Sequence, residues 1–126
     1  MVEMQRANPW SAALFSSPKI RRVLGDATEL LPAVAAASFD AVLHDPPTAA
    51  MSGELYSEAF YRELARILRP GGALFHYIGD PTSQASGKLF RGVAARLRDA
   101  GFDAVRTNRD AFGITAVAGR LETEMD

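Results

Sequence analysis

Residues 39–48 read Phe39-Asp40-Ala41-Val42-Leu43-His44-Asp45-Pro46-Pro47-Thr48, and this stretch decides the fold class. A short apolar run that ends at chain breakers is typical of a buried strand in a parallel sheet. Neither proline donates a backbone N–H, and Pro46 restricts Asp45 to an extended conformation, so the strand is expected to end at His44. Open α/β sheets bind their ligands at the carboxyl ends of the strands. We therefore expect Asp45 at the ligand-binding end of a central strand.

Length and composition limit the classes of protein that fit. The 126 residues suit a single domain, 1–126, that can bury a core. With 14 basic and 15 acidic residues the net charge is −1, which excludes a global attraction to nucleic acid or to an anionic membrane. Cysteine is absent, which excludes disulfides, thiolate metal sites and cysteine nucleophiles. No apolar run approaches the roughly 20 residues of a membrane span, and the amino terminus lacks a signal-peptide layout. We expect a cytoplasmic protein with no membrane partner.

The first third of the chain predicts helices at 2–7 and 8–15, a strand at 20–24 and a helix at 27–36. Asp26, with Glu29 three residues later, fits a capping box for that last helix. Pro32 is expected to split or kink it, because proline interrupts the helical hydrogen bonds.

The rest of the chain alternates between helix and strand patterns. The loop 48–53 leads into apolar residues at helical spacing from Leu55 to residue 69, and Pro70-Gly71-Gly72 ends that helix. The further elements expected are a strand at 73–78, a loop at 81–87, a helix at 88–100, and an antiparallel strand pair at 104–107 and 114–118. This alternation indicates an α/β fold with a mainly parallel sheet.

Several motifs, in order, resemble those of the class I S-adenosylmethionine-dependent methyltransferases. They are Gly25-Asp26-Ala27, Phe39-Asp40 leading to Asp45-Pro46-Pro47, and Leu68-Arg69-Pro70-Gly71-Gly72, and the resemblance runs over about residues 8–118. A closer resemblance is to archaeal-type methyltransferases related to spermidine synthases, carried by Asn8-Pro9-Trp10-Ser11, His44-Asp45-Pro46-Pro47, residues 53–61 and Leu74-Phe75-His76-Tyr77. The resemblance implies a Rossmann-like fold with an antiparallel last strand, and S-adenosylmethionine as cofactor.

The same resemblance implies roles for individual residues. Asp26 would accept a hydrogen bond from the adenine amine, with the backbone of Ala27 beside it. His44 and Asp45 would lie by the methyl donor, while Asp45, Pro46 and Pro47 would hold the nucleophile. The substrate side would include Thr48, Tyr56, His76 and Tyr77. The acceptor implied is a nitrogen or oxygen nucleophile on a small molecule, an RNA or a protein.

Two departures from the family pattern stand out. Thr48 occupies the position of an aromatic residue in the Asp-Pro-Pro-aromatic motif of amino-group methyltransferases, which weakens the case for a nucleobase amine as acceptor. No Gly-x-Gly precedes Gly25, where the family places its cofactor loop. The chain thus resembles the last two-thirds of a methyltransferase, truncated at its amino terminus. We expect self-association, or a partner chain that completes the sheet, because an apolar strand edge would otherwise be exposed.

Two alternatives to methyl transfer remain open. An aminopropyltransferase would use decarboxylated cofactor and grip a polyamine with the carboxylates of Asp45, Asp80, Glu54 and Glu58. The other alternative is a truncated, non-catalytic paralogue retained for binding. We expect no metal at His44 and His76, because two histidines without a ligand spacing are more often packed or hydrogen-bonded. Four basic residues of the helix at 88–100 are expected to form a solvated face: Lys88, Arg91, Arg96 and Arg98.

Overall fold

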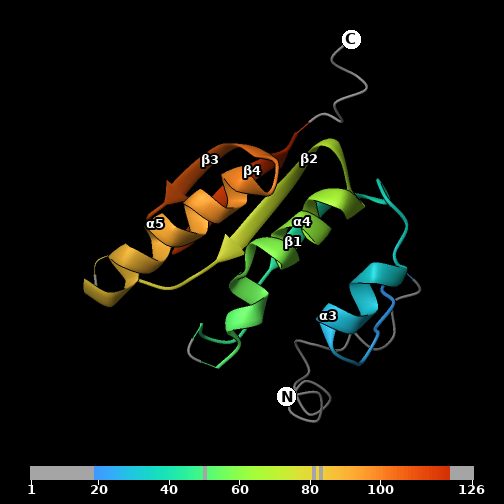
Figure 1. Ribbon diagram of the computed structural model, residues 1–126, viewed down its shortest axis with the longest axis horizontal. Coiled ribbons are helices and arrows are strands. Elements are labelled where there is room, and N and C mark those ends of the chain that lie inside the picture. Colours follow the sequence, from blue (N-terminus) through green and yellow to red (C-terminus); the bar gives the residue numbers. More distant parts are fainter. Residues whose placement is uncertain (1–18, 50, 81, 83, 120–126) are drawn as a thin grey trace.

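The structure is a computed structural model that describes residues 19–49, 51–80, 82 and 84–119. The helices expected at 2–7 and 8–15 lie outside these residues. In chain order the elements are α3 (Ala27–Leu30), η2 (Leu31–Ala33), β1 (Phe39–His44), η3 (Gly53–Tyr56), α4 (Glu58–Ile67), β2 (Leu68–Tyr77), α5 (Gln84–Asp99), β3 (Phe102–Asn108) and β4 (Gly113–Ala118) (Figure 1).

The four strands of the described chain form one sheet in the order β1-β2-β4-β3. β1 is parallel to β2, and His44 lies opposite His76 in that pair. β4 is antiparallel both to β2 and to β3, so it is the one reversed strand of this sheet. The α/β prediction and the antiparallel final strand pair are therefore confirmed. The pairing also places the carboxyl ends of β1 and β2 side by side.

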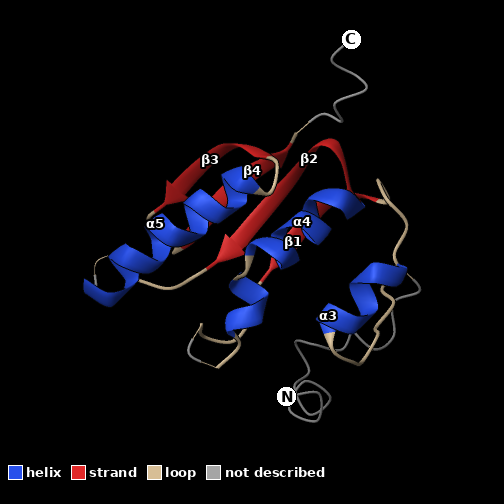
Figure 2. Cartoon of the chain, in the orientation of Figure 1, coloured by secondary structure: helices blue, strands red, loops and turns tan. Residues whose placement is uncertain are grey.

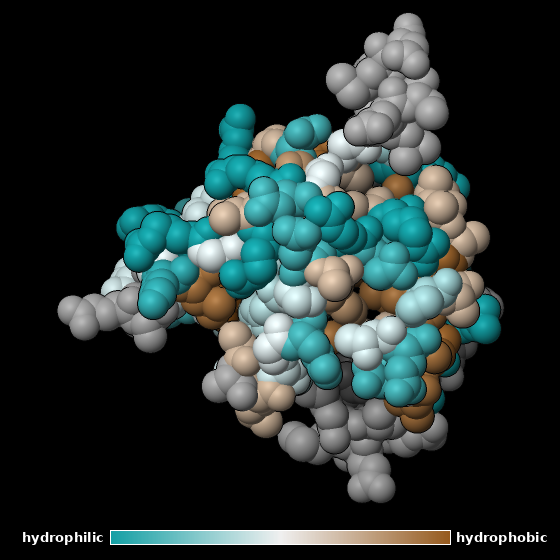
Figure 3. All heavy atoms as spheres, in the orientation of Figure 1, coloured by the Kyte–Doolittle hydropathy of each residue, from teal (hydrophilic) through white to brown (hydrophobic). Residues whose placement is uncertain are grey.

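Helices α4 and α5 cover one face of the sheet (Figure 2). Side chains alternate along each strand, so Leu74 and His76 of β2 and Ile114 of β4 point into this helix-covered face and are buried. The helices contribute apolar stripes to the same core, with Tyr61 from α4 and Val93 from α5 fully buried. The outer surface around α4 and α5, which faces the viewer in Figure 3, is mainly hydrophilic.

The segment predicted as one helix from 55 to 69 is divided at Ser57. The Ser57 backbone is extended, and its hydroxyl accepts a hydrogen bond from the N–H of Phe60, which caps α4. α4 ends at Ile67, because the chain enters β2 at Leu68. The expected stop at Pro70-Gly71-Gly72 instead lies within β2, as an irregularity between the pairs Phe39–Leu68 and Ala41–Ala73. Gly71 has a φ of 84° there, a conformation that favours glycine.

Three other expectations differ from the structure. Residues 20–24 form no strand, and Ile20, Val23 and Leu24 are exposed, because none of the four described strands pairs with this segment. β1 is an edge strand of the described sheet and not a central one. Part of the loop expected at 81–87 is helical, since α5 begins at Gln84. The predicted split at Pro32 is confirmed, because α3 gives way there to the 3-10 turn η2. No helix within the described residues is long and apolar enough to cross a membrane.

Candidate functional site

The candidate site lies where β1 and β2 end next to each other. Asp45 follows β1 directly and its side chain is exposed. Tyr77, the last residue of β2, is 41% exposed and lies opposite Gly113 of β4. The structure thus brings an exposed carboxylate and an exposed phenol together at the carboxyl ends of β1 and β2. Open α/β sheets bind their ligands at the carboxyl ends of their strands.

Tyr56 holds the loop that follows Asp45 in place. The hydroxyl of Tyr56 donates a 2.8 Å hydrogen bond to the carbonyl of Pro47, and the Tyr56 side chain is buried. The carbonyl of Thr48 accepts hydrogen bonds from the N–H groups of Met51 (2.9 Å) and Ser52 (3.0 Å). Burial, and to a smaller extent the negative charge of Asp45, raises the pKa of Tyr56, so this hydroxyl keeps its proton and remains a donor. The Pro-Pro backbone is therefore fixed by tertiary contacts.

The rings of His44 and His76 form a buried pair at the ends of β1 and β2, with ring centroids 4.4 Å apart. The Nδ1 of His76 lies 2.9 Å from the carbonyl of Tyr77, so Nδ1 carries the proton. The Nε2 of the neutral ring then accepts a 2.9 Å hydrogen bond from the hydroxyl of Tyr61. Nε2 of His44 donates in the same way to the carbonyl of Leu55, at 2.9 Å.

The surroundings keep both rings neutral. Burial lowers the pKa of His76 to about 3, with a further lowering from His44 and Arg96. Burial also lowers the pKa of His44, although its hydrogen bond to Leu55 and the charge of Asp45 oppose the change. Both ring nitrogens of His76 are engaged by the protein, and no cluster of three or more potential metal ligands occurs in the described part of the chain. The two histidine rings are therefore part of the hydrogen-bonded core.

Tyr61 and Arg96 belong to this network but were not predicted as site residues. Burial raises the pKa of Tyr61, which keeps its hydroxyl protonated as the donor to His76. Nε of Arg96 donates a 2.8 Å hydrogen bond to the carbonyl of Tyr56, so the expectation of a solvated face is wrong for Arg96. Tyr61 is 15 residues from His76 and Arg96 is 40 residues from Tyr56. No local sequence pattern reports contacts over such separations.

The residues expected to bind adenine lie at the start of α3. The exposed carboxylate of Asp26 accepts hydrogen bonds from the backbone N–H (2.9 Å) and the hydroxyl (2.7 Å) of Thr28, which caps the helix. The hydrogen bonds to Thr28 lower the pKa of Asp26, so it is ionised at neutral pH. Ala27 is the exposed first residue of α3. Asp26 is confirmed as the helix cap, with Thr28 and not Glu29 as its side-chain partner, while the adenine role of Asp26 and Ala27 remains a prediction.

The carboxylates proposed for a polyamine site are dispersed. Glu54 lies in η3, whereas Glu58 is the first residue of α4. Glu58 pairs with Arg62 at 2.8 Å. Asp80 accepts hydrogen bonds from the N–H (2.9 Å) and the hydroxyl (2.7 Å) of Thr82. Glu58 and Asp80 thus have partners within the chain.

Comparison with known proteins identifies the family. The sequence model of the S-adenosyl-L-methionine-dependent methyltransferases matches residues 11–113, which include β1, β2 and β3 and end at the first residue of β4. The chain belongs to this family.

Individual relatives match the chain in different proportions. An uncharacterized protein of Methanocaldococcus jannaschii is 44% identical over 121 residues, which are 95% of this chain and 42% of the relative. A polyamine aminopropyltransferase of Mycobacterium tuberculosis is 37% identical over 97 residues, 73% of this chain and 18% of that enzyme. The chain thus spans less than half of the length of these relatives.

Among solved structures, spermidine synthase from Thermotoga maritima superposes with a TM-score of 0.62 at 19% identity. The match covers 86% of this chain and 38% of the spermidine synthase chain. It establishes the Rossmann-like fold expected from the sequence.

Proposed function

We propose that this chain carries the acceptor side of a methyl-transfer site, in which a methyl group moves from S-adenosylmethionine to a nitrogen or oxygen nucleophile. The observation that supports this most directly is the exposed carboxylate of Asp45, which follows β1 and leads into a proline loop held by Tyr56. A rigid loop suits this chemistry, because alignment of donor and acceptor supplies much of the rate enhancement.

Asp45 has a simple role in such a reaction. S-adenosylmethionine supplies the electrophilic methyl group when it is bound. The carboxylate of Asp45 would accept a hydrogen bond from the N–H or O–H of the acceptor and orient its lone pair toward the methyl carbon. The carbonyl of Pro46 is a second acceptor within the same loop, whereas the carbonyl of Pro47 is already engaged by Tyr56. Tyr77 and Thr48 are both exposed near the carboxyl ends of β1 and β2, where they would contact the acceptor.

The buried residues would act through the exposed ones. The side chains of Tyr56 and His76, implied by the resemblance to touch the substrate, are buried and hydrogen-bonded, so we assign them to positioning the loop and β2. The ring of His44 is likewise engaged, so any contact of His44 with the cofactor is made by its backbone. Asp26 and Ala27 remain the proposed contacts to adenine. We also propose a cytoplasmic location for the chain.

Aminopropyl transfer is the second candidate, and the 37% identity to a polyamine aminopropyltransferase favours it. It requires several carboxylates around one amine chain. Asp45 is the carboxylate best placed at the strand ends, since Glu58 and Asp80 are engaged with Arg62 and Thr82. We therefore rank methyl transfer first.

Nuclear magnetic resonance titration of the full chain tests this proposal, because it detects binding in the millimolar range. S-adenosylmethionine and S-adenosylhomocysteine should shift the backbone amides of Asp26, Ala27, His44 and Asp45. A clear preference for decarboxylated S-adenosylmethionine would favour aminopropyl transfer. Shifts confined to other regions, or no shifts with any of the three ligands, would instead indicate a non-catalytic module.

A further inference from the structure

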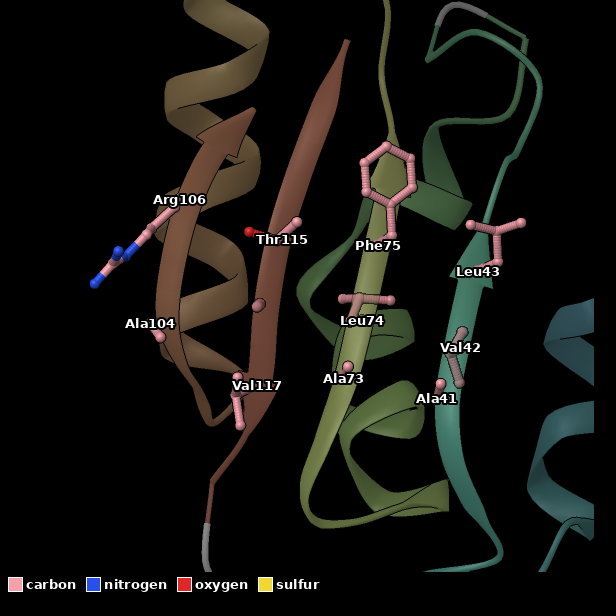
Figure 4. A pocket seen from close by; sticks show the side chains of 11 residues that line it. Ala41, Val42, Leu43, Ala73, Leu74, Phe75, Ala104, Arg106, Thr115 and Val117 are labelled. Atoms are coloured by element: carbon pink, nitrogen blue, oxygen red, sulfur yellow. The ribbon is translucent and has the colours of Figure 1, made fainter. Parts of the chain in front are cut away.

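Two grooves on the described surface differ in chemistry. The face of the sheet opposite α4 and α5 is open to solvent, with Leu43 77% exposed, and its groove of about 630 Å³ is mainly apolar (Figure 4). A second groove, of about 720 Å³, runs along α5. The described residues that line it are Lys88, Leu89, Arg91, Gly92 and Arg96, and we call it the α5 groove.

The α5 groove is strongly positive. Three of its described lining residues are cations, and none carries a carboxylate. The ion pairs among the described residues lie within α4 and between β1 and β2, so none of them neutralises a cation of the groove. Lys88 and Arg91 are three residues apart on one helix, where like charges repel. The local potential therefore favours an anion as the occupant.

Gly92 makes room in this groove for the guanidinium of Arg96. A Cβ on residue 92 would lie 2.9 Å from Nη1 of Arg96 and 3.5 Å from Nη2, so the guanidinium rests directly on the backbone of α5. Nε of Arg96 is fixed by its 2.8 Å hydrogen bond to the carbonyl of Tyr56. Glycine lowers the stability of a helix relative to alanine, and here it allows a position of Arg96 that alanine would block. The guanidinium is thus held in place before any ligand binds.

We propose that the α5 groove binds a phosphate group through the side chains of Lys88, Arg91 and Arg96. Phosphate suits these residues, because a planar guanidinium donates parallel hydrogen bonds to its oxygens and keeps its own charge at every physiological pH. A phosphate monoester also carries up to two negative charges near neutral pH, where a carboxylate carries one. A groove of this volume accommodates a small organic molecule, so the phosphate would be one group of a larger ligand, either a sugar phosphate or an RNA strand.

The α5 groove adjoins the candidate site through Tyr56. The carbonyl of Tyr56 accepts the hydrogen bond from Arg96, and its hydroxyl donates to the carbonyl of Pro47. Phosphate binding is measured without S-adenosylmethionine, so its failure and the failure of the proposed function are distinguishable.

Nuclear magnetic resonance titration of the full chain with sodium phosphate tests the proposal, with the ionic strength held constant by sodium chloride. The amides of residues 88–96 should shift and saturate, and sodium acetate should bind there about fivefold or more weakly. Arg91→Gln should weaken phosphate binding about fivefold or more, because a charge-assisted donor is lost. Arg98→Gln is the matched control, since Arg98 is exposed on the same helix but does not line the groove. Its affinity should change by about twofold or less, because solvent and salt screen a more distant charge.

A second pair of variants tests the role of Gly92 without removing a charge. Gly92→Ala should weaken phosphate binding about fivefold or more, because the added Cβ displaces the guanidinium of Arg96. The chain should remain folded, since alanine favours a helix. In Gly87→Ala the added Cβ lies 3.7 Å from Nη1 of Arg91, an ordinary contact, and the affinity should be unchanged.

Ribose 5-phosphate and an oligouridylate distinguish the two sources of the phosphate group, and neither contains adenine that could bind at Asp26. Tighter binding of ribose 5-phosphate would identify a phosphate monoester as the ligand, and tighter binding of the oligouridylate would identify the phosphodiester of RNA. Three results would overturn the proposal: no shifts in residues 88–96 with phosphate, equal affinity for acetate and phosphate, or equal losses in Arg91→Gln and Arg98→Gln.

Discussion

The side chain of Asp45 is exposed, but the backbone around it is not free to move. β1 fixes the residue before it, and the bond from Tyr56 to Pro47 fixes the loop after it. If Asp45 orients the acceptor, Asp45→Asn in a full-length context should lower turnover by about 100-fold or more, the usual scale for a positioned acid–base group. Stability should change little. Asp40→Asn, at the far end of the same strand, is the control. Equal turnover in the two variants would contradict the role of Asp45.

Asp26 has one demonstrated role and one proposed role. As a cap for α3 its removal lowers the unfolding midpoint, because the N–H of Thr28 loses its acceptor. As an adenine ligand its removal also weakens cofactor binding by about tenfold or more. Titration of Asp26→Ala with S-adenosylhomocysteine separates the two. The control is Thr28→Val, which removes the hydroxyl donor to Asp26 but leaves its carboxylate in place. A loss of stability with unchanged affinity would leave Asp26 with the capping role alone.

The buried histidine pair makes the fold sensitive to acid. The pKa of His76 is about 3 in the folded chain and 6.5 in its ordinary state, so between these values the unfolded chain binds more protons. The stabilisation is complete above pH 6.5 and is lost as the pH falls toward 3. His76 alone should lower the free energy of unfolding by about 2 kcal/mol between pH 6.5 and pH 5. His44, the other histidine of the chain, acts in the same direction.

Urea unfolding at pH 7, 6 and 5 measures this effect. The midpoint should fall as the pH is lowered, and the fall should be smaller in His76→Gln, which cannot titrate. A midpoint that is constant or rises between pH 7 and pH 5 would show that the pair is not held neutral.

Some features of the site depend on residues close in sequence, and others depend on residues far along the chain. Asp45 could be predicted from its neighbours, because Pro46 and Pro47 end the strand after an apolar run. The cap at Asp26 depends on Thr28, two residues away. The burial of Tyr56 and His76 depends on Tyr61, Arg96 and the way α5 packs on the sheet. Such packing is set by the whole fold, so the sequence suggested substrate contacts where the structure has hydrogen-bonded core.

At the scale of elements, the predictions succeeded where a segment and its partners both lie in the described chain. β1, β4 and the division of the helix at Pro32 follow from local patterns. Residues 20–24 carry a strand pattern without a strand, because backbone pairing needs a neighbour that the described sheet does not provide. The early start of α5 at Gln84 has a different cause, since glutamine and alanine favour the helix and offset the cost of the serine and glycine that follow them.

Gly113 sets the contact between β2 and β4. A Cβ at this position would lie 2.8 Å from Cζ of Phe75 and would also meet the carbonyl of His76. Gly113→Ala should therefore destabilise the fold by about 1–3 kcal/mol, the usual cost of overpacking. In Gly87→Ala, within α5, the added Cβ meets only a side-chain nitrogen of Arg91 at 3.7 Å. That control should be stabilising by about 0.5–1 kcal/mol, as expected for replacing glycine within a helix. Equal unfolding midpoints for the two variants would contradict this account of the β2–β4 pair.

At the scale of the whole molecule, the order of elements was enough to predict a sheet with a reversed last strand. Alternating helices and strands with short connections leave few topologies, and the observed order β1-β2-β4-β3 is one of them. The sequence predicted an exposed strand edge but placed β1 at the centre of the sheet, and it did not reveal that one face is open. Both features depend on whether another strand or helix lies next to β1, and the residues of a strand do not indicate this by themselves.

The same geometry predicts how the 126 residues bind S-adenosylmethionine on their own. The contacts proposed here come from Asp26, Ala27, His44 and Asp45. No Gly-x-Gly precedes Gly25 to receive the amino-acid portion of the cofactor, and β1 has an unpaired edge. Each missing polar contact costs about 1 kcal/mol or more, so the dissociation constant should be about millimolar or weaker.

Isothermal titration of the purified chain measures this affinity, with sedimentation confirming the monomer. Micromolar binding by the monomeric chain would show that these 126 residues already form a complete cofactor pocket.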